Sequence, residues 1–234
     1  MLREKFDLTG KIALVTGSTR GIGQAIGDAF EEYGAKVIRH NTKVCDLVNP
    51  KAIDAWFDKL EQEGSLPDIL VCNASIQAKI PWVEFPLDEA QKEMQINFFA
   101  TLRMFQRCYP KMKAQKWGRL IAVGSVNERR PRPDMCIYAA TKSAQENLVR
   151  NIARQVAADG ITVNNLCPGI FDTDRNADCF SNPAFRAQAI SAVPLHDFAQ
   201  PEDAAGTELL LASEAGRYIT GATILIDGGL SLPN

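Results

Sequence analysis

Residues 14–26 read LVTGSTRGIGQAI and join a short apolar run to an amphipathic one. Gly17, Gly21 and Gly23 permit a tight turn and let the backbone approach a pyrophosphate. The N-terminus of a following helix would stabilise the charge of that group. Glycines in a turn are also compatible with a plain strand-to-helix connection, but a strand before and a helix after is the context that the motif requires. The stretch therefore predicts a dinucleotide-binding unit.

The same alternation of strands and helices continues along the chain. Six runs are apolar almost throughout, as parallel strands covered on both faces are: 11–17, 36–40, 68–74, 118–125, 161–169 and 222–229. Helical patterns between them include one that ends at Gly34 and two longer ones over 87–115 and 134–158. We predict an α/β fold, a single-domain Rossmann-like doubly wound parallel sheet with helices on both faces, over 1–234.

Residues 170–200 do not follow this alternation of strands and helices. They are polar, contain Pro183 and Pro194, and follow the carboxyl end of a predicted strand. Open α/β sheets bind ligands at that edge, so we predict a mobile substrate flap with one or two short helices.

Composition excludes several classes of protein. With 26 basic and 28 acidic residues the net charge is −2, which favours neither nucleic acid nor an anionic membrane as partner. The N-terminus is charged within its first six residues and has no long apolar run, so we expect no secretory signal and no membrane span. The scattered cysteines lack metal-site spacing and favour reduced thiols in a cytoplasmic protein without a metal: Cys45, Cys72, Cys108, Cys136, Cys167 and Cys179.

The segment after the second predicted strand bears on the choice of cofactor. Dinucleotide folds usually carry an acid about 20 residues after the glycines, where it binds a ribose hydroxyl. Here the first acid is Asp46, which we assign to the next strand, so the usual crossover helix must be tiny or absent. Donors and cations precede it instead: Arg39, His40, Asn41, Thr42 and Lys43. Together with Arg20 in the glycine turn they favour NADP(H) over NAD(H), unless they are merely solvated.

Residues 136–148, CIYAATKSAQENL, place Tyr138 one helical turn before Lys142. Bringing a phenol from a pKa of about 10 to about 7 requires roughly 4 kcal/mol. A cation about 4 Å away supplies roughly that at an effective dielectric constant near 20. Such a pair also occurs by accident on surface helices. Our hypothesis is that Lys142 lowers the pKa of Tyr138, which acts as a general base or acid.

With these motifs the chain resembles the classical short-chain dehydrogenase/reductases over essentially its whole length, and among them 3-oxoacyl-carrier-protein reductases and gluconate or sugar-alcohol dehydrogenases. The resemblance rests on an ordered set of motifs: TGSTRGIG (16–23), CDL (45–47), CNAS (72–75), INFFA (96–100), GS (124–125), YAATK (138–142), PGIFDT (168–173) and IDGG (226–229). Cys72 and Ser75 depart from the family's Asn-Asn-Ala-Gly turn after the fourth strand.

The resemblance implies roles for individual residues. The catalytic set is Asn97, Ser125, Tyr138 and Lys142, with Ser125 polarising the substrate oxygen, Asn97 holding a water beside the lysine, and Lys142 also holding ribose hydroxyls. The implied cofactor contacts are Gly17, Ser18, Thr19, Arg20, Gly21, Ile22, Gly23, Arg39, Asn41, Asp46, Leu47, Asn73, Ala74, Ser75, Tyr138, Lys142, Pro168, Gly169, Ile170 and Thr173. His40 and His196 match no hydrolase or metal pattern and are taken as bystanders.

The expected activity is an NAD(P)(H)-dependent oxidoreductase that interconverts a secondary alcohol and a ketone. Arg129, Arg130 and Arg132 could bind an anionic substrate such as a sugar acid, or belong to a solvated or subunit-contact loop; a polyol or a 3-oxoacyl thioester is also open. Alternatives are a non-catalytic NADP(H) sensor or scaffold, and an epimerase or dehydratase. The apolar final strand is an edge that needs cover; the resemblance implies a homotetramer, with a dimer second.

Overall fold

The computed structural model describes residues 1–233, apart from the side chains of residues 178 and 179. Its strands form one parallel sheet in the order β2-β1-β3-β4-β5-β6. Their bounds are β1 Ile12–Val15, β2 Lys36–Arg39, β3 Ile69–Cys72, β4 Gly118–Val123, β5 Ile161–Pro168 and β6 Thr223–Ile226. Each lies within one of the six predicted runs, so the strand predictions are confirmed.

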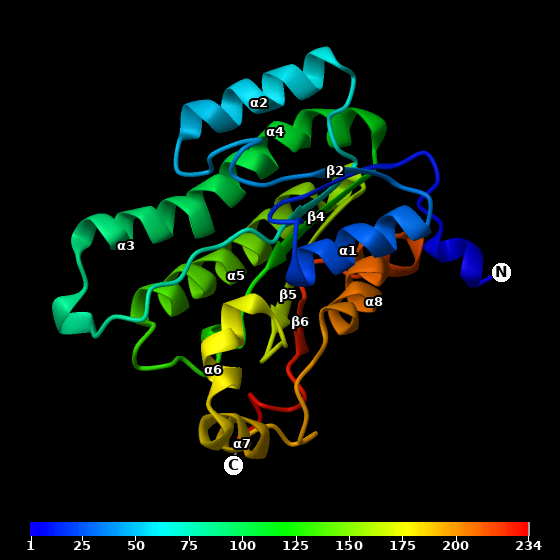
Figure 1. Cartoon of the computed structure of the whole chain (residues 1–234). Helices are drawn as coiled ribbons and strands as arrows, with labels where there is room; N and C mark the ends of the chain where they lie inside the picture. Colours follow the sequence, from blue (N-terminus) through cyan, green and yellow to red (C-terminus); the bar gives the residue numbers. More distant parts are fainter. Residues whose placement is uncertain (234) are drawn as a thin grey trace.

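Helices cover both faces of the sheet (Figure 1). Their bounds are α1 Gly21–Glu32, α2 Pro50–Gln62, α3 Leu87–Met94, α4 Ala100–Gln115, α5 Cys136–Val156, α6 Ala177–Ser181, α7 Pro183–Ser191 and α8 Pro201–Ala212. One apolar core joins the sheet to α2, α4 and α5, and a second joins it to α1 and α8. The doubly wound α/β architecture is therefore confirmed. The helix predicted over 87–115 is α3 and α4, joined by a π-helical segment, Gln95–Phe99.

The connection from β2 to α2 is unusually short. Residues 40–49 contain neither a helix nor a strand, which confirms the missing crossover helix, whereas the assignment of Asp46 to a strand is wrong. The side chain of Asn41 accepts from Lys43 N, and that of Asp46 accepts from Val48 N. Such local bonds compete with a strand ladder. The CNAS turn consequently follows the third strand of the sheet, and β2 forms its edge.

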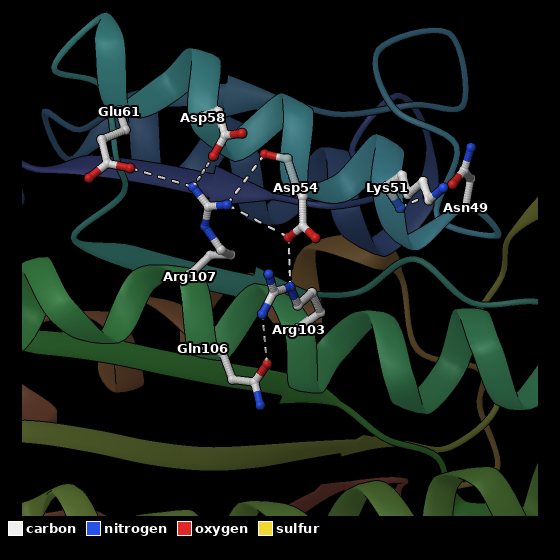
Figure 2. Close-up of polar contacts among 8 residues, drawn as sticks. All are labelled: Asn49, Lys51, Asp54, Asp58, Glu61, Arg103, Gln106 and Arg107. Carbon is white, nitrogen blue, oxygen red and sulfur yellow. Dashed lines mark hydrogen bonds and ion pairs between the residues drawn. The ribbon is translucent and has the colours of Figure 1, made fainter.

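Ion pairs fix α2 against α4 beside this short connection (Figure 2). Arg103 Nε lies 2.6 Å from Asp54 Oδ1, and Arg107 Nη2 lies 2.6 Å from Asp58 Oδ1 and 3.5 Å from Glu61 Oε2. Exposed pairs contribute little singly, but Arg107 is only 17% exposed and contacts three carboxylates. These ion pairs hold α2 against α4, although no strand lies between β2 and α2 in the sequence.

Residues 170–200 leave the sheet at the end of β5 and return to α8. They contain the 3₁₀ helix η6 (Asp174–Asn176) and the short helices α6 and α7, as predicted for the flap. Phe171 pairs with Ala199 at its base, where Asp172 N donates to Ala199 O at 2.8 Å. Figure 1 shows α6 and α7 together at one end of the molecule. Mobility of the flap stays a prediction.

Two expectations from composition can be compared with the structure. No described helix is long and apolar enough to span a membrane. Cys45, Cys72, Cys108, Cys136 and Cys167 are free thiols, while Cys179 lies outside the described side chains. Within the described residues no cluster has the composition of a metal site.

One carboxylate of α8 is buried in the core. Glu208 is fully buried, and neither of its carboxylate oxygens has a hydrogen-bond partner among the described residues. Burial raises the pKa of this carboxyl to about 8. Since an unpaired buried charge is costly, the side chain is neutral in the folded protein at neutral pH.

Glu208 should therefore make stability depend on pH. Between pH 4.5, its ordinary pKa, and about 8, the unfolded chain loses the proton that the folded chain keeps, so stability falls as pH rises. The loss is roughly 3 kcal/mol at pH 7, at about 1.4 kcal/mol per unit. We expect Glu208→Leu to raise the melting temperature at pH 7.5 much more than at pH 4.5 in calorimetry. The exposed Glu202→Leu control on the same helix should leave the pH dependence unchanged; equal stabilisation at both pH values would contradict this assignment.

Candidate active site

A cavity of about 670 Å³ opens at the carboxyl ends of β1, β3, β4 and β5. Its walls come from the glycine turn, the turn after β3, the segment after β4, the start of α5 and the flap. The predicted site residues that line it are Gly17, Arg20, Gly21, Ile22, Asn73, Ser75, Ser125, Tyr138, Pro168, Gly169, Ile170 and Thr173. The topology thus brings together residues up to 156 positions apart in the sequence.

The glycine turn is bonded tightly to the turn after β3. Asn73 Nδ2 donates to Thr16 O at 2.9 Å and to Gly17 O at 3.1 Å, and Ala74 N donates to Thr16 Oγ1. A Cβ at Gly23 would lie 2.4 Å from both Asn73 Nδ2 and Gly17 O, so α1 can approach the turn only because residue 23 is glycine. Gly17 itself has a φ of +64°, which also favours glycine.

His40 supports this turn from behind. Its Nδ1 accepts from Gly17 N at 3.2 Å, which places the ring proton on Nε2, where it donates to Cys45 O at 2.9 Å. The ring stacks at 5.1 Å on Trp56, and burial lowers its pKa. His40 takes no part in a hydrolase or metal pattern, as expected, but it is not a bystander: it links the glycine turn to the loop at 40–49.

Other predicted residues lie outside the cavity lining: Ser18, Thr19, Gly23, Arg39, Asn41, Asp46, Leu47, Ala74, Asn97 and Lys142. Arg39 turns back onto α1, where Nη2 lies 2.6 Å from Asp28 Oδ1 and 2.8 Å from Glu31 Oε2. These two carboxylates neutralise Arg39, which the sequence predicts to bind the 2′-phosphate of NADP(H). Arg20 is 77% exposed and pairs with Asp174 at 3.3 Å.

Ser125 follows β4 and caps a short 3₁₀ helix. Its Oγ accepts from the backbone and side-chain nitrogens of Asn127, each at 3.2 Å. Glu128 Oε1 accepts from Ser125 N at 2.9 Å, completing a capping box, and also binds Asn165 Nδ2. Burial raises the pKa of Glu128 to about 7. Because Ser125 Oγ accepts two hydrogen bonds from Asn127, its own proton remains available for donation, and the Ser125 side chain acts to lower the pKa of Tyr138.

Tyr138 and Lys142 lie one turn apart on α5, with Lys142 Nζ 5.8 Å from the centre of the Tyr138 ring. Both side chains are buried. Burial raises the pKa of the Tyr138 phenol, and the opposing effects of Arg175, Ser125 and Ser75 do not offset it. Burial, reinforced by Arg175, lowers the pKa of Lys142 to about 8. The pKa of Tyr138 is therefore shifted in the direction opposite to the expected one, because desolvation outweighs the charges nearby, and a stabilising effect of Lys142 on the phenolate stays a prediction.

Asn97 lies in the π-helical segment and joins three parts of the site. Its Oδ1 accepts from Ile76 N, and its Nδ2 donates to Ile76 O at 2.9 Å and to Thr141 Oγ1 at 3.0 Å. Thr141 Oγ1 donates in turn to Tyr138 O. π-Helical turns occur frequently at functional sites. Here the side chain of Asn97 binds the turn after β3 to the helix that carries Tyr138.

A buried polar chain behind Lys142 escaped the sequence reasoning. Lys142 Nζ donates to Val123 O at 2.6 Å and to Gln145 Oε1 at 3.0 Å. Gln145 Nε2 donates to Thr101 Oγ1 at 3.2 Å, and Thr101 Oγ1 donates to Asn97 O at 3.4 Å. The chain fixes the Gln145 amide with its oxygen toward the ammonium. The sequence could have indicated this contact, because a polar residue, Gln145, lies three positions after Lys142 and therefore on the same face of α5.

The three arginines of the segment 127–135 have different surroundings. Arg129 pairs with Glu146 at 2.6 Å and is not among the lining residues. Arg130 lines the cavity and donates to Leu230 O at 2.7 Å. Arg132 also lines it and pairs with Asp134 at 2.9 Å. Arg175, from the flap, lies in the same cavity and was not singled out from the sequence.

The fold and this arrangement of side chains occur in known proteins. A family model described as enoyl-(acyl carrier protein) reductase matches residues 40–231. A 3-oxoacyl-[acyl-carrier-protein] reductase of Vibrio cholerae is 32% identical over 96% of this chain and 98% of its own. The chain belongs to the short-chain dehydrogenase/reductase family. The family's oxidoreductases act on CH–OH and keto groups, and this chain is an enzyme of that kind.

Solved structures of the family superpose closely on the model. A gluconate 5-dehydrogenase from Burkholderia cenocepacia J2315, in complex with NADP and tartrate, has a TM-score of 0.94 at 29% identity and covers 100% of both chains. A 3-oxoacyl (acyl-carrier-protein) reductase from Agrobacterium tumefaciens C58 with NADP bound has a TM-score of 0.89 at 33% identity and covers 97% of both chains.

The residues present fit a nicotinamide dinucleotide, the cofactor that the short-chain dehydrogenase/reductase fold implies. The N-terminus of α1 faces the cavity at Gly21, where backbone N–H groups and the helix dipole favour a pyrophosphate. Added Cβ atoms would crowd Gly17 against Asn73 and Gly169 against Asp227. Glycine at these positions therefore lets the segments that line the cavity pack against one another.

Gln145 should position Lys142 in a measurable way. In Gln145→Leu, the ammonium loses one of two buried acceptors, so its charged form is destabilised and its pKa falls. Loss of a hydrogen bond to a charged group predicts about a 10-fold lower kcat with little change in KM. The rate of alcohol oxidation rises with pH, and in the variant this rise should occur at higher pH, because a neutral Lys142 no longer stabilises a phenolate.

The exposed neighbour provides the control, since Ser143→Ala removes a hydroxyl from the solvent face of the same turn. Steady-state kinetics across pH 6–10 would measure both variants. If kcat of Gln145→Leu fell with an unmoved pH profile, Gln145 would have only a packing role.

Proposed function

We propose that this protein is an NADP(H)-dependent oxidoreductase that interconverts a secondary alcohol and a ketone, with Tyr138 as proton donor and acceptor. The observation that carries the proposal is the convergence of Ser125 and Tyr138 on the cavity that the glycine turn also lines, with Lys142 Nζ 5.8 Å from the centre of the Tyr138 ring. The nicotinamide supplies the hydride chemistry when bound. The chain must then hold the substrate oxygen and move its proton.

Tyr138 is suited to donate that proton at neutral pH. Because burial raises the pKa of its phenol, the hydroxyl is fully protonated there and can act as a general acid toward a carbonyl oxygen. The Ser125 hydroxyl, oriented by Asn127, supplies a second donor for the same oxygen. We therefore propose carbonyl reduction as the favoured direction at neutral pH, with alcohol oxidation increasing as pH rises.

Lys142 provides the charge that makes loss of this proton possible. Its ammonium has three hydrogens, and Val123 O and Gln145 Oε1 accept two of them. The ammonium lies 5.8 Å from the centre of the Tyr138 ring, and a positive charge there favours a developing phenolate. Asn97 keeps Tyr138 in place by binding Thr141. The water that the family resemblance assigns to Asn97 stays a prediction.

The preference for NADP(H) rests on the absence of an acid and on the cations near the glycine turn. Arg20 adjoins Gly21, and Asn41 and Lys43 lie on the loop at 40–49, while Arg39 is engaged by α1. The two related structures described above were determined with NADP, which supports the same preference.

We propose a small polar or anionic substrate. Besides Arg20, four cationic side chains line the cavity that Tyr138 also lines: Lys79, Arg130, Arg132 and Arg175. The related gluconate 5-dehydrogenase was determined with tartrate, a hydroxy dicarboxylate, whereas the related 3-oxoacyl reductases act on thioesters by name. A reduction assay at 340 nm with 5-ketogluconate, its neutral counterpart L-sorbose, and acetoacetyl thioester separates these classes; equal rates with the neutral ketose would refute the anionic preference.

Assembly and location belong to the same proposal. β6 is an edge strand whose Leu225 is 42% exposed, and a second subunit would cover it, which supports a homotetramer or a dimer. The free thiols of the described cysteines support a cytoplasmic location.

Tyr138→Phe removes the acid while keeping the ring. We expect kcat to fall by at least about 100-fold, because general acid catalysis contributes about that much or more. NADPH affinity, measured by fluorescence titration, should stay within about twofold. Tyr218→Phe, at a residue that is 93% exposed, is the matched control. Undiminished turnover in Tyr138→Phe would refute the mechanism, and a wild-type protein that binds NADPH but reduces no carbonyl would favour a cofactor sensor.

Arg20 should select the 2′-phosphate. Arg20→Ala is expected to raise the Kd for NADPH by about 10-fold, the effect of one charge-assisted contact, and to leave the Kd for NADH unchanged. Arg217→Ala, an exposed arginine beyond α8, is the control. Calorimetric titration with both cofactors makes the measurement, and equal weakening of NADPH and NADH would show that Arg20 serves the pyrophosphate instead.

A further inference from the structure

Arg175 lies in the substrate part of the cavity and is bound only by neutral groups. It belongs to η6 at the start of the flap, and it reaches across to the turn after β3. Its Nη1 donates to Ser75 Oγ at 2.9 Å, and its Nη2 donates to Ser75 O at 2.6 Å. None of the described side chains forms an ion pair with Arg175.

Other arginines of the cavity have anionic or structural partners. Arg20 pairs with Asp174, and Arg132 pairs with Asp134. Arg130 is tied to the C-terminal segment through Leu230 O. Arg175 thus keeps a full positive charge toward the cavity, with one residue as its partner.

Arg175 uses two guanidinium nitrogens in this contact. They donate to two oxygens of Ser75, and the same pair of nitrogens can bind both oxygens of a carboxylate or phosphate. A charged acceptor forms such bonds about twice as strongly as a neutral one. A substrate anion therefore gains by replacing Ser75 at Arg175.

Ser75 also places Arg175 relative to the reacting atoms. Ser75 and Arg175 both lie near the Tyr138 hydroxyl, since each of them acts to lower the pKa of that phenol. A molecule whose carbonyl oxygen meets Tyr138 can therefore present a second group to Arg175.

We propose that Arg175 binds a carboxylate of the substrate, which makes the substrate an oxo acid or its hydroxy acid. This inference rests on the proposed function. Ser75 holds the guanidinium in place until the acid binds.

The substrate, and not a cofactor phosphate, is the ligand that the positions favour. The site for phosphate is the N-terminus of α1 with Gly21 and Arg20. Arg175 instead lies close enough to Tyr138 and Lys142 to lower the pKa of both groups, in addition to the effect of burial on each. Its charge is therefore at the reacting end of the cavity.

The test compares an acid with its uncharged ester in one assay. The probes are 3-oxobutanoate and methyl 3-oxobutanoate, which have the same reacting ketone, each reduced with NADPH. In Arg175→Met, kcat/KM should fall by about 30-fold for the acid and stay within about threefold for the ester. Arg175→Lys, which keeps the charge without the fork, should recover part of the loss. Arg186→Met, on α7 of the same flap and outside the cavity lining, should leave both rates unchanged.

Three results would overturn the assignment. Equal losses for acid and ester in Arg175→Met would mean that Arg175 only shapes the flap. A raised Kd for NADPH in that variant would assign Arg175 to the cofactor. A wild-type enzyme that reduces the ester as efficiently as the acid would show that the site does not use the charge, while leaving the proposed function intact. A wild-type enzyme that reduces neither probe nor any ketone of the panel above would remove the proposed function, and this inference with it.

Discussion

The organisation of the site depends on a single buried cation. Lys142 is 1% exposed, and an ammonium in such a place is stable only if its hydrogens find acceptors. Val123 at the end of β4 and Gln145 on α5 provide them. The end of β4 and the Lys142 turn of α5 must therefore lie close enough for both acceptors to reach Nζ. Tyr138, one turn earlier on the same helix, takes its position from this requirement, and Ser125 takes its position from the end of the same strand.

Much of this could be predicted from the sequence. The strands were recognised because parallel strands are apolar throughout, and the glycine turn because it lies between a strand and a helix. Ser125, Tyr138 and Lys142 followed from motifs whose spacing is short or whose order is fixed. The helix across Asn97 was recognised by its pattern, but its π-helical turn was not, since one extra residue per turn leaves the apolar periodicity almost unchanged.

The parts that could not be predicted depend on contacts between distant segments. Arg39 and Asp28 are eleven positions apart, yet only the packing of β2 on α1 shows that they pair. The same holds for His40 and Gly17, and for Arg175 and Ser75, which are 100 positions apart. The pKa of Tyr138 was assigned from one neighbouring charge. The structure adds the loss of hydration, which is larger, and this reverses the direction of the shift.

The two edges of the sheet differ in how readily they could be extended by another strand. β2 begins with Lys36 and ends with Arg39, and charged side chains on an edge discourage pairing with a second chain. β6, with the sequence TILI, has no such charge. Two copies joined through β6 would leave only the two β2 edges free, and both carry charges. Extension of the sheet would then stop at a symmetric pair.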